Sequence, residues 1–489
     1  MSYHLTTPIY YVNAAPHIGH AYTTIAADVL FRLYGGKAKQ DKLTSLTDSH
    51  QFTTGTDENS LKNVEAAAKA GKPVQEYVDE LSGIWKQTWE QLGIEGFTFI
   101  RTSGSIHKQA VEKFWTIVAS KGDIYKDKYV GLYCRGCEAY VNETDLQDGK
   151  CPSHLALPDT LEEENYFFRA SRYRDAILAH IEANPDFISP ASRRNETISF
   201  IKNNFSDISI SRQNLEWGIP VPGDPEQVIY VWFDALINYI SAVGYGWDEH
   251  YFEKQWPADL HLVGKDIIKF HCALWPAMLL SAGIELPKKI FAHGFFTIDG
   301  QKISKSLGNA IDPLQIAEKY GNDVLRYYLL AKIPFGSDGD FSFAELEATY
   351  NADLANVLGN LVSRLSNMVE KYFDGRLDTQ PLCIDMRKGQ EFEAIFEDFV
   401  ALRFKEGLEQ IWARLRLANK RIEEEKPWVL HKTGETQRLE EVLTQLVEEV
   451  IQLAMRFQPV LPDTARKVFD ALWQDKIVKA KPLFPKLAD

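Results

Sequence analysis

The chain opens with a strand-like run that ends in a turn and leads into a helix, and this order strongly limits the folds it can adopt. Residues Tyr3 to Tyr11 are rich in β-branched and aromatic side chains, and residues 13–16 (Asn-Ala-Ala-Pro) follow as a turn. Apolar side chains at Ile25, Leu30 and Leu33 predict a helix after the turn. A strand, a turn and a helix in this order are typical of the first βα unit of a doubly wound parallel sheet.

Further patterns divide the 489 residues into several parts, as expected for a chain about three times the usual ~150 residues of a domain. Residues 120–170 hold three cysteines and many turn formers, which indicates a small inserted module. The runs Val228–Phe233 and His261–Gly264 are strand-like and predict that an α/β architecture resumes. We therefore predict an α/β domain in two halves, with a connective insertion between them and a separate C-terminal domain, at residues 1–115, 227–342, 116–226 and 343–489 respectively.

The C-terminal part is predicted to be an α-helical bundle. From Phe343 onward, apolar residues recur every three or four positions in three runs, which is the spacing of a helix face that packs on a core. These runs are Leu354, Val357, Leu358, Leu361, Leu365 and Met368, then Phe404, Leu408, Ile411, Trp412 and Leu415, and finally Leu439, Val442, Leu443, Leu446 and Val450.

The composition is that of a globular protein, with 45% hydrophobic and 25% charged residues, and this excludes a disordered chain or a fibre. The net charge of −14 disfavours nucleic acid over the surface as a whole. Residues 351–489 carry 21 basic and 23 acidic side chains, against 33 and 45 in residues 1–350. A polyanionic partner therefore meets less repulsion at the C-terminal part.

No membrane or secretory segment is expected. The longest apolar stretch, Ala273–Leu280, contains a proline and is much shorter than the ~20 residues of a membrane span. The N-terminus lacks the basic and apolar regions of a signal peptide. Five cysteines favour a reducing compartment over a disulfide framework, and the isolated Cys272 and Cys383 are expected to be buried thiols. We therefore expect a cytoplasmic protein.

The other three cysteines form two close pairs with a histidine, Cys134-x2-Cys137 and Cys151-x2-His154, separated by thirteen residues. Two close ligand pairs joined by a loop are what a tetrahedral Cys3His zinc site needs. Four protein ligands leave no open position, so we predict one structural zinc per chain. A redox role for the first pair is less favoured because no thioredoxin-like βαβ pattern surrounds it.

The tetrapeptide His17-Ile18-Gly19-His20 lies between the predicted first strand and first helix. A helix N-terminus offers N–H groups and the positive end of the helix dipole to an anion, and a glycine allows another group to approach the backbone closely. Two imidazoles three residues apart would face the same side and contact phosphate oxygens. Two ordinary histidines at a helix start give the same pattern, so the tetrapeptide is weak evidence by itself.

A second motif, Lys302-Ile303-Ser304-Lys305-Ser306, follows a turn at Asp299-Gly300. Two lysines in a loop suit a triphosphate whose negative charge grows as pyrophosphate leaves, although most lysine pairs lie in solvated surface loops. Together with His17–His20, this motif resembles the HIGH and KMSKS signatures of the class I aminoacyl-tRNA synthetases, which have a Rossmann-type α/β catalytic domain. The chain departs from the second signature at Ile303, where methionine is usual, and this change exchanges one apolar side chain for another.

Other stretches, in one order over nearly the whole chain, resemble the methionyl-tRNA synthetases of that class. They are Thr6–Asn13 (TTPIYYVN), Gly55–Glu58 (GTDE), Tyr230–Ala235 (YVWFDA), Gly264–Asp266 (GKD), Phe270-His271 and Trp275-Pro276. The resemblance implies an ATP- and Mg²⁺-dependent, AMP-forming ligase. Such an enzyme activates methionine to methionyl-adenylate and transfers it to the 3′ end of tRNA(Met).

The resemblance also implies roles for individual residues. Catalysis would rest on His17, His20, Lys302 and Lys305, and ATP would bind through these four together with Gly19 and Asp266. Methionine would bind through Ile9, Tyr11, Asp57, Trp232, Ala235, Leu236, Tyr239, Phe270, His271 and Trp275, with Asp57 holding the ammonium group. The anticodon would contact Asn360, Arg364 and Trp428 of the helical bundle domain, and the connective insertion would carry the zinc knuckle.

The residue types fit these roles. Aromatic walls meet a thioether sulfur favourably, at ~0.3–1.5 kcal/mol per contact, and Tyr11 or His271 could donate a hydrogen to that sulfur. An asparagine, an arginine and a tryptophan supply the hydrogen bonds and the stacking by which single-stranded bases are read. Each aromatic residue taken alone is more simply explained by core packing, and an exposed Asn/Arg pair by a solvated helix face. The ordered set favours the functional interpretation.

Two departures lie beside the implied ammonium site. After Gly55–Glu58 these synthetases usually continue His-Gly, whereas this chain has Asn59-Ser60. The stretch 37–52 is long and polar where we expect one continuous apolar strand, so either the second strand is displaced or a surface loop precedes it. Both features put the role of Asp57 at risk. No further C-terminal dimerisation domain follows residue 489, so we expect a monomer.

Two other functions remain open at this point. The chain could be another class I ligase, for isoleucine, leucine, valine or cysteine. The first three usually carry a large editing insertion, for which the connective insertion leaves little room. Cysteine ligases normally expose a zinc site in the catalytic region, whereas the zinc site predicted here is closed. The more distant alternative is a non-catalytic tRNA-binding or regulatory paralogue, which the lysines and histidines of the two motifs disfavour and Asn59-Ser60 favours.

Overall fold

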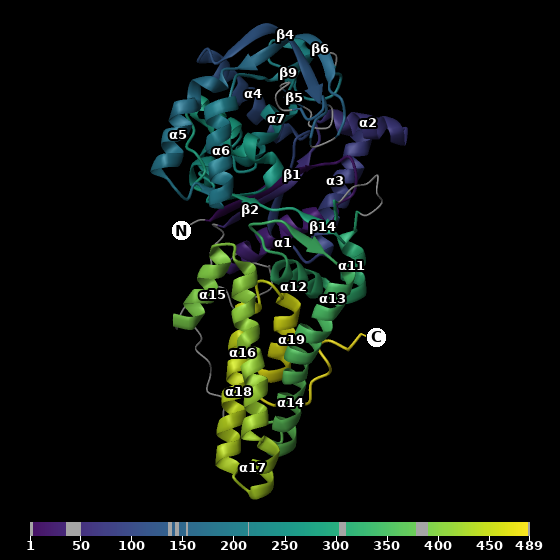
Figure 1. Cartoon of the computed structure of the whole chain (residues 1–489), viewed down its shortest axis with the longest axis vertical. Coiled ribbons are helices and arrows are strands. Elements are labelled where there is room, and N and C mark those ends of the chain that lie inside the picture. The colour runs from purple at the N-terminus through teal and green to yellow at the C-terminus, as the bar shows by residue number, and fades with distance from the viewer. Residues whose placement is uncertain are drawn as a thin grey trace. The chain divides into compact units, whose positions relative to one another are not determined.

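The computed structural model describes residues 3–35, 50–134, 139–141, 146–152, 155–213, 215–302, 310–377 and 390–487 (Figure 1). The described chain forms two compact units. The first unit comprises Met1–Pro16, Gly35–Glu90 and Glu95–Ala292, and the second comprises His17–Tyr34, Gln91–Ile94 and His293–Asp489. The predictions about Cys137, His154, Ile303, Lys305 and Cys383, and about residues 37–49, fall outside the described residues.

The first unit is built on a six-stranded sheet with the order β3-β2-β1-β12-β13-β7. Its strand β1 (His4–Tyr11) pairs in parallel with β2 (Gln51–Asp57) on one side and with β12 (Leu260–Gly264) on the other. The strand order reverses at this point, and doubly wound sheets bind their ligands at the carboxyl ends of the strands beside such a reversal. The parallel sheet predicted from the N-terminal unit is therefore confirmed, and it also contains β3 (Phe97–Arg101), β13 (Ile290–His293) and β7 (Ile188–Ser189).

Strand β2 is buried along its whole length although its residues are mostly polar. Its side chains form hydrogen bonds across the sheet, because Thr7 Oγ1 donates to Thr54 Oγ1 at 2.7 Å and His4 Nε2 lies 3.2 Å from Thr53 Oγ1. At Gly55 the neighbouring strand approaches so closely that a Cβ atom would lie 2.0 Å from the carbonyl oxygen of Ile100. Hydrogen bonds and close backbone packing thus replace the apolar contacts expected for this strand.

Two antiparallel sheets follow α4 (Ser105–Ser120) along the chain. In the four-stranded sheet β5-β4-β6-β8, the long strands β4 (Ile124–Cys134) and β6 (Asp159–Phe168) pair from Ile124↔Phe168 to Tyr133↔Asp159. The remaining elements of this region are β5 (Ala139–Val141), α5 (Arg174–Ala183), α6 (Ala191–Asn204), β8 (Ile208–Ser209), β9 (Ser211–Gln213), β10 (Pro220–Val221) and β11 (Asp224–Ile229).

The prediction of a strand over Val228–Phe233 is wrong for its second half. Strand β11 ends at Ile229, and helix α7 (Val231–Leu236) begins two residues later. The carbonyl of Tyr230 accepts hydrogen bonds from the backbone N–H groups of Phe233 and Asp234, at 2.9 and 3.0 Å, and so starts the helix. The turn carries Phe233 into the core, where it is fully buried. Burial therefore overrides the strand preference of the β-branched and aromatic residues.

The first unit contains further helices, some of which are part of the core. They are α2 (Leu61–Ala70), α3 (Val74–Gln91), α8 (Asn238–Ser241), α9 (Glu249–Gln255) and α10 (Trp275–Ala282), the last preceded by a π-helical turn at Phe270–Leu274. In the described parts of the chain, no helix is both long and apolar enough to cross a membrane.

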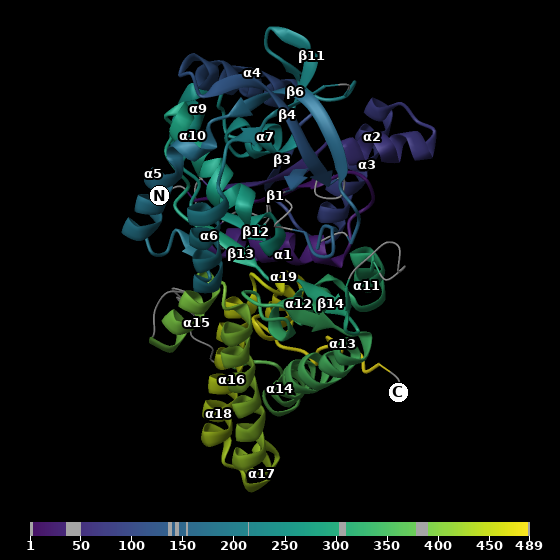
Figure 2. The ribbon, with the colours of Figure 1, turned by 45° about the horizontal axis from the view of Figure 1, so that its top comes forward.

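The second unit is mostly helical, and its helices α14, α16 and α18 run side by side in Figures 1 and 2. The apolar residues of the three predicted runs are buried, except for the half-buried Val357, so the helical bundle is confirmed. The helices are α1 (Ile18–Leu33), α11 (Pro313–Tyr320), α12 (Asn322–Lys332), α13 (Phe343–Thr349), a π-helical segment (Tyr350–Gly359), α14 (Asn360–Phe373), α15 (Gln390–Val400), α16 (Phe404–Glu425), α17 (Pro427–Thr433), α18 (Thr436–Phe457) and α19 (Pro462–Leu472). A small sheet contains β14 (Phe296–Ile298), β15 (Gln301–Lys302) and β16 (Gly339–Phe341).

A buried ion pair joins helices α1 and α12 inside the second unit. Arg326 Nη2 lies 2.6 Å from Asp28 Oδ2, and neither side chain is more than 1% exposed. The same guanidinium donates to the carbonyl oxygens of Val460 and Pro459, at 2.6 and 2.9 Å, just before α19. Buried charges are tolerated only when they are paired and hydrogen-bonded. This arrangement therefore sets how α1, α12 and the chain leading into α19 pack together.

Candidate active site

The carboxyl ends of β1 and β2 bring together three of the residues expected to bind methionine. Ile9 pairs in register with Gly55, and Tyr11 pairs with Asp57. Asp57 is buried at the end of β2, while Ile9 and Tyr11 are half-buried. Lys62 Nζ lies 4.7 Å from the centre of the Tyr11 ring. This edge thus places a carboxylate beside an aromatic ring at the point where the sheet reverses its order.

A second group of expected residues lies on α7 and on the π-helical turn before α10. The rings of Trp232 and Phe270 stack with their centres 3.8 Å apart and their planes inclined by only 4°. Both residues are half-buried, and His271 meets the Trp232 ring edge-on with the ring centres 6.2 Å apart. Two parallel aromatic rings at the edge of the core form a flat, polarizable wall that suits an unbranched thioether.

The hydrogen bonds of His271 assign its protonation. Its Nδ1 lies 3.0 Å from the carbonyl oxygen of Ile267, and its Nε2 lies 2.7 Å from the hydroxyl of Tyr239. A carbonyl only accepts, so Nδ1 carries the hydrogen and Nε2 accepts from Tyr239. Burial lowers the pKa of His271 to about 4, which keeps the ring neutral at neutral pH. His271 therefore has no hydrogen left to offer a sulfur atom.

His261 is a buried histidine to which no role was assigned from the sequence, and it contacts Trp275, Thr6 and Tyr239. Trp275 Nε1 donates to His261 Nε2 at 3.2 Å, so the hydrogen of His261 is on Nδ1 and is donated to Thr6 Oγ1 at 2.7 Å. The Tyr239 ring packs against His261 with the ring centres 4.3 Å apart. Burial also lowers the pKa of His261. In the sequence, His261 is marked only by its place in the strand-like run that ends at Gly264. That position does not distinguish a histidine of the core from one that binds a ligand.

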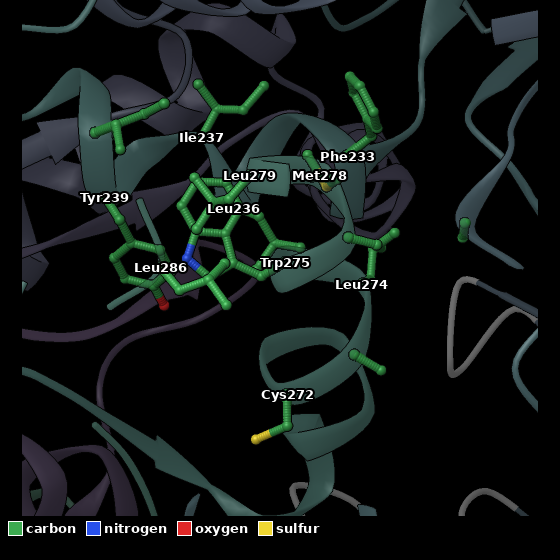
Figure 3. Packing of buried hydrophobic residues seen from close by; sticks show 14 of the residues in the cluster. Phe233, Leu236, Ile237, Tyr239, Cys272, Leu274, Trp275, Met278, Leu279 and Leu286 are labelled. Atoms are coloured by element: carbon green, nitrogen blue, oxygen red, sulfur yellow. The ribbon is translucent and has the colours of Figure 1, made fainter. Parts of the chain in front are cut away.

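The expected methionine-binding residues therefore fall into groups that differ in how deeply their side chains are buried. Leu236, Tyr239 and Trp275 belong to the hydrophobic core, where they pack with one another as Figure 3 shows. Ala235 and His271 are also buried, whereas Trp232 and Phe270 pack against the core from its margin. The deepest members of the set pack within the core, so they could shape a pocket only from behind the residues at its margin. Cys272 is buried in the same core, as predicted.

Residues Asn59 and Ser60, where the chain departs from the usual His-Gly, have defined structural contacts. Ser60 is the N-cap of α2, and its Oγ accepts a hydrogen bond from the backbone N–H of Lys62 at 3.0 Å. Asn59 Nδ2 donates to the carboxylate of Asp234 on α7 at 2.7 Å. Asp57 is the last residue of β2, two residues before Asn59 in the chain.

In the second unit, the two histidines of the first motif form the start of α1. The His17 Nδ1 accepts a hydrogen bond from the backbone N–H of Gly19, and the His20 Nδ1 accepts one from that of His17, each at 3.1 Å. Their rings stack with the centres 3.7 Å apart. The expectation that both imidazoles face the same side is therefore confirmed. Because each Nδ1 is an acceptor, each neutral ring carries its hydrogen on Nε2, from which it can donate to an anion.

The second motif begins on the second strand of a tight hairpin in the same unit. Thr297 on β14 pairs with Lys302 on β15, and the hairpin turns through Asp299 and Gly300, which both have positive φ angles. Asp-Gly is a favoured sequence for such a turn because both residues tolerate this backbone conformation. The turn predicted before the lysine motif is therefore confirmed. In the first unit, Asp266 is exposed in the 3₁₀ turn Lys265–Ile267, directly after the carboxyl end of β12.

The three residues expected to contact an anticodon all lie in the second unit, on two helices. Asn360 is exposed at the first turn of α14, and Arg364 is half-buried one turn later. Trp428 on α17 is 42% exposed, which is unusual for so large an apolar side chain. Arg364 Nη2 forms an ion pair with Glu423 at 2.6 Å. Glu423 is the first residue of an acidic run, 423–425, and it is exposed to solvent while it also neutralises Arg364.

Two of the four expected zinc ligands are described, and both are buried. Cys134 ends β4 and Cys151 lies in a turn, and each side chain is only 2% exposed. The carbonyl of Cys151 accepts a hydrogen bond from the backbone N–H of Leu155 at 2.7 Å. Among the described residues, no group of three or more His, Cys, Asp or Glu side chains is placed to hold a metal ion.

Comparison with known proteins gives the same picture at the level of the whole chain. The family model for class I tRNA synthetases (M) matches residues 3–157 and 134–366. A methionine–tRNA ligase from Thermotoga maritima is 47% identical over 96% of this chain and 75% of its own length. One from Streptomyces coelicolor is 41% identical over 100% of this chain and 91% of its own length.

Solved structures agree. The methionyl-tRNA synthetase of Mycobacterium tuberculosis in complex with methionyl-adenylate is 40% identical, with a TM-score of 0.91 over 99% of both chains. The apo form of that enzyme has a TM-score of 0.83 at 37% identity, over 100% of this chain and 98% of that one. The chain therefore belongs to the class I tRNA synthetases and, within them, to the methionine–tRNA ligase family. Members of this family join methionine to tRNA.

The buried neutral histidines predict how the stability of the first unit depends on pH. Burial lowers the pKa of His4 to about 3, whereas an unfolded histidine has a pKa of about 6.5. Between these values the unfolded chain binds a proton that the folded chain does not. The free energy of unfolding therefore falls as the pH is lowered, by about 1.4 kcal/mol per pH unit for each such histidine.

We expect the His4→Gln variant to lose this dependence for one histidine. Between pH 5.5 and pH 4.5 its free energy of unfolding should fall less steeply than that of the wild type, by about 1.4 kcal/mol per pH unit. Urea denaturation at several pH values measures both slopes, and comparing slopes removes any constant loss of stability caused by the substitution. Equal slopes for the two proteins would contradict the assignment of a neutral, buried His4.

Proposed function

We propose that the chain activates methionine with ATP to methionyl-adenylate and transfers the methionyl group to the 3′ end of tRNA(Met). The observation that carries this proposal is the pairing of Tyr11 with Asp57 at the carboxyl edge of the sheet, where its strand order reverses. Family membership supplies the reaction, and this edge is where a doubly wound sheet presents a ligand site.

In this proposal Asp57 holds the ammonium group of methionine. The stacked rings of Trp232 and Phe270 line the side chain, and the pocket is completed by Ile9, Tyr11, Ala235, Leu236, Tyr239, His271 and Trp275. Both ring nitrogens of His271 already form hydrogen bonds, one with the carbonyl of Ile267 and one with the hydroxyl of Tyr239. Tyr11 rather than His271 is therefore the donor to the sulfur of methionine. His271 acts instead by holding the hydroxyl of Tyr239.

The proposed chemistry needs no covalent intermediate with the enzyme. A carboxylate oxygen of methionine attacks the α-phosphorus of ATP, the bond from that phosphorus to the bridging oxygen breaks, and pyrophosphate leaves with Mg²⁺. His17 and His20 donate from Nε2 to phosphate oxygens, Lys302 and Lys305 stabilise the growing negative charge, and Gly19 and Asp266 complete the ATP site. The rate enhancement then comes from positioning and from electrostatic stabilisation.

Methionine-dependent exchange of pyrophosphate into ATP tests the first step. We expect exchange with methionine and none above background with leucine, isoleucine or cysteine. The Lys305→Ala variant should lose exchange by about two orders of magnitude or more while its affinity for methionine, measured by calorimetry, stays near that of the wild type. No exchange with any amino acid, from folded protein that binds tRNA, would contradict the proposal and favour a tRNA-binding paralogue.

For the second substrate, we propose that the anticodon contacts Asn360, Arg364 and Trp428. The exposed indole of Trp428 offers a stacking surface, and the two polar side chains offer hydrogen bonds to base edges. The nearly neutral charge of residues 351–489 supports this placement. A base that binds Arg364 would take the place of Glu423 as its partner.

The Trp428→Ala variant should separate the two steps. Loss of base stacking, worth ~1–3 kcal/mol, should raise the KM for tRNA(Met) about tenfold or more in aminoacylation, while pyrophosphate exchange without tRNA stays unchanged. The matched control is Phe343→Ala, since Phe343 is an aromatic residue with the same 42% exposure and no proposed contact with the anticodon. Equal damage to both steps in Trp428→Ala, or an equal effect of the control, would argue against an anticodon contact.

We also propose that Cys134, Cys137, Cys151 and His154 hold one structural zinc ion. The burial of Cys134, at the end of β4, and of Cys151 supports the donor set, and three thiolates with one imidazole suit tetrahedral zinc. When bound, the ion would cross-link the turns of the connective insertion and take no part in the reaction.

Metal analysis of the purified chain tests the zinc site. We expect about one zinc per chain, and we expect Cys151→Ser to lose it and to unfold at a lower temperature, because a structural zinc contributes to folding. Cys272→Ser serves as the control, since Cys272 is a buried cysteine outside the two pairs. A wild-type chain purified without chelators and free of zinc would contradict the proposal.

A further inference from the structure

The methionine-binding residues of the proposed site come from two separate segments, and one buried hydrogen bond connects these segments. Asn59 follows Asp57 by two residues at the end of β2, and Asp234 follows Trp232 by two residues on α7. The amide Nδ2 of Asn59 donates to Asp234 Oδ2 at 2.7 Å. Asn59 is 3% exposed and Asp234 is fully buried, so water does not screen this contact.

Each end of this hydrogen bond is held by further contacts within the first unit. Asn59 Nδ2 also approaches the carbonyl oxygen of Thr102 at 3.2 Å. The other carboxylate oxygen of Asp234 accepts from His107 Nε2 at 2.6 Å, and His107 Nδ1 lies 2.9 Å from the hydroxyl of Ser241 on α8. Asp234 therefore receives a donor on each oxygen, which a buried carboxylate needs.

We propose that Asn59 is a positioning residue for methionine binding. It fixes the distance between the end of β2, which carries Asp57, and α7, which carries Trp232 and Ala235. It acts through Asp234 and touches no substrate itself. This inference rests on the proposed function, because it assigns the ammonium group to Asp57 and the side chain to the wall at Trp232. It gives the departure at position 59 a role, since an amide supplies the donor that the buried carboxylate requires.

The isosteric variant Asn59→Asp tests this role. It keeps the size of the side chain but removes the Nδ2 donor and places a second carboxylate against Asp234. A hydrogen bond to a buried charged group contributes more than one between neutral groups. We expect the KM for methionine in pyrophosphate exchange to rise at least about tenfold, with the KM for ATP changed less than about twofold. A general loss of structure would affect both constants together.

The double variant Asn59→Asp/Asp234→Asn tests the contact itself, because it exchanges donor and acceptor between the two positions. We expect it to recover most of the methionine affinity that the single variant loses. Gln410→Glu is the matched control. Gln410 Nε2 also donates to a carboxylate, Asp398 Oδ2, at 2.5 Å in the helical second unit, and its loss should leave the KM for methionine unchanged.

The outcomes separate this inference from the function on which it rests. An unchanged KM for methionine in Asn59→Asp, or a double variant no better than the single one, would overturn the positioning role while wild-type exchange still supports the function. Absence of exchange in the wild type would instead overturn the proposed function. If Asn59→Asp does not fold, Asn59→Ala is measured against the same criterion of a raised KM for methionine at constant KM for ATP.

Discussion

Parallel pairing of β1 with both β2 and β12 is the constraint on which the proposed site depends. It places the carboxyl ends of three strands at one edge of the sheet, where Tyr11 ends β1, Asp57 ends β2 and the turn that holds Asp266 follows β12. Side chains alternate between the two faces of a strand, and a slip of one residue would move every side chain of β2 to the opposite face. The close approach at Gly55, where only a residue without Cβ fits against Ile100, helps to hold this register.

Buried polar contacts, as well as apolar packing, hold this arrangement together. His4 joins β1 to β2 through Thr53, His261 joins β1 to α10 through Thr6 and Trp275, and His271 holds Tyr239. Burial keeps these three histidines neutral by lowering their pKa values. Each such contact has directional requirements, so these hydrogen bonds specify one packing of the core more narrowly than apolar contacts do. The ion pair of Asp28 and Arg326 has the same effect in the second unit.

The departures from the family pattern become understandable from their contacts. Ser60 caps α2 through its hydroxyl, a contact that the usual glycine could not make, and Asn59 supplies a donor to a buried carboxylate. The polar strand β2 remains buried because its threonines form hydrogen bonds with β1. Each of these residues thus has a defined contact in the fold. They do not disturb the position of Asp57 at the end of the strand.

Local patterns in the sequence were sufficient for the N-terminal βα unit, the helical runs of the C-terminal part and the stacked start of α1, because neighbouring residues determine periodicity, turn chemistry and helix caps. The family resemblance, carried by short motifs in order, led to the correct family. The second half of the strand predicted over Val228–Phe233 is wrong because burial of Phe233 decides that segment. The sequence also could not separate the core residues Tyr239 and Trp275 from the marginal Trp232 and Phe270. Nor could it pair Asn59 with Asp234, 175 residues away. How deeply a side chain is buried and which distant residue it contacts depend on which segments the sheet brings together. Only the tertiary structure decides this.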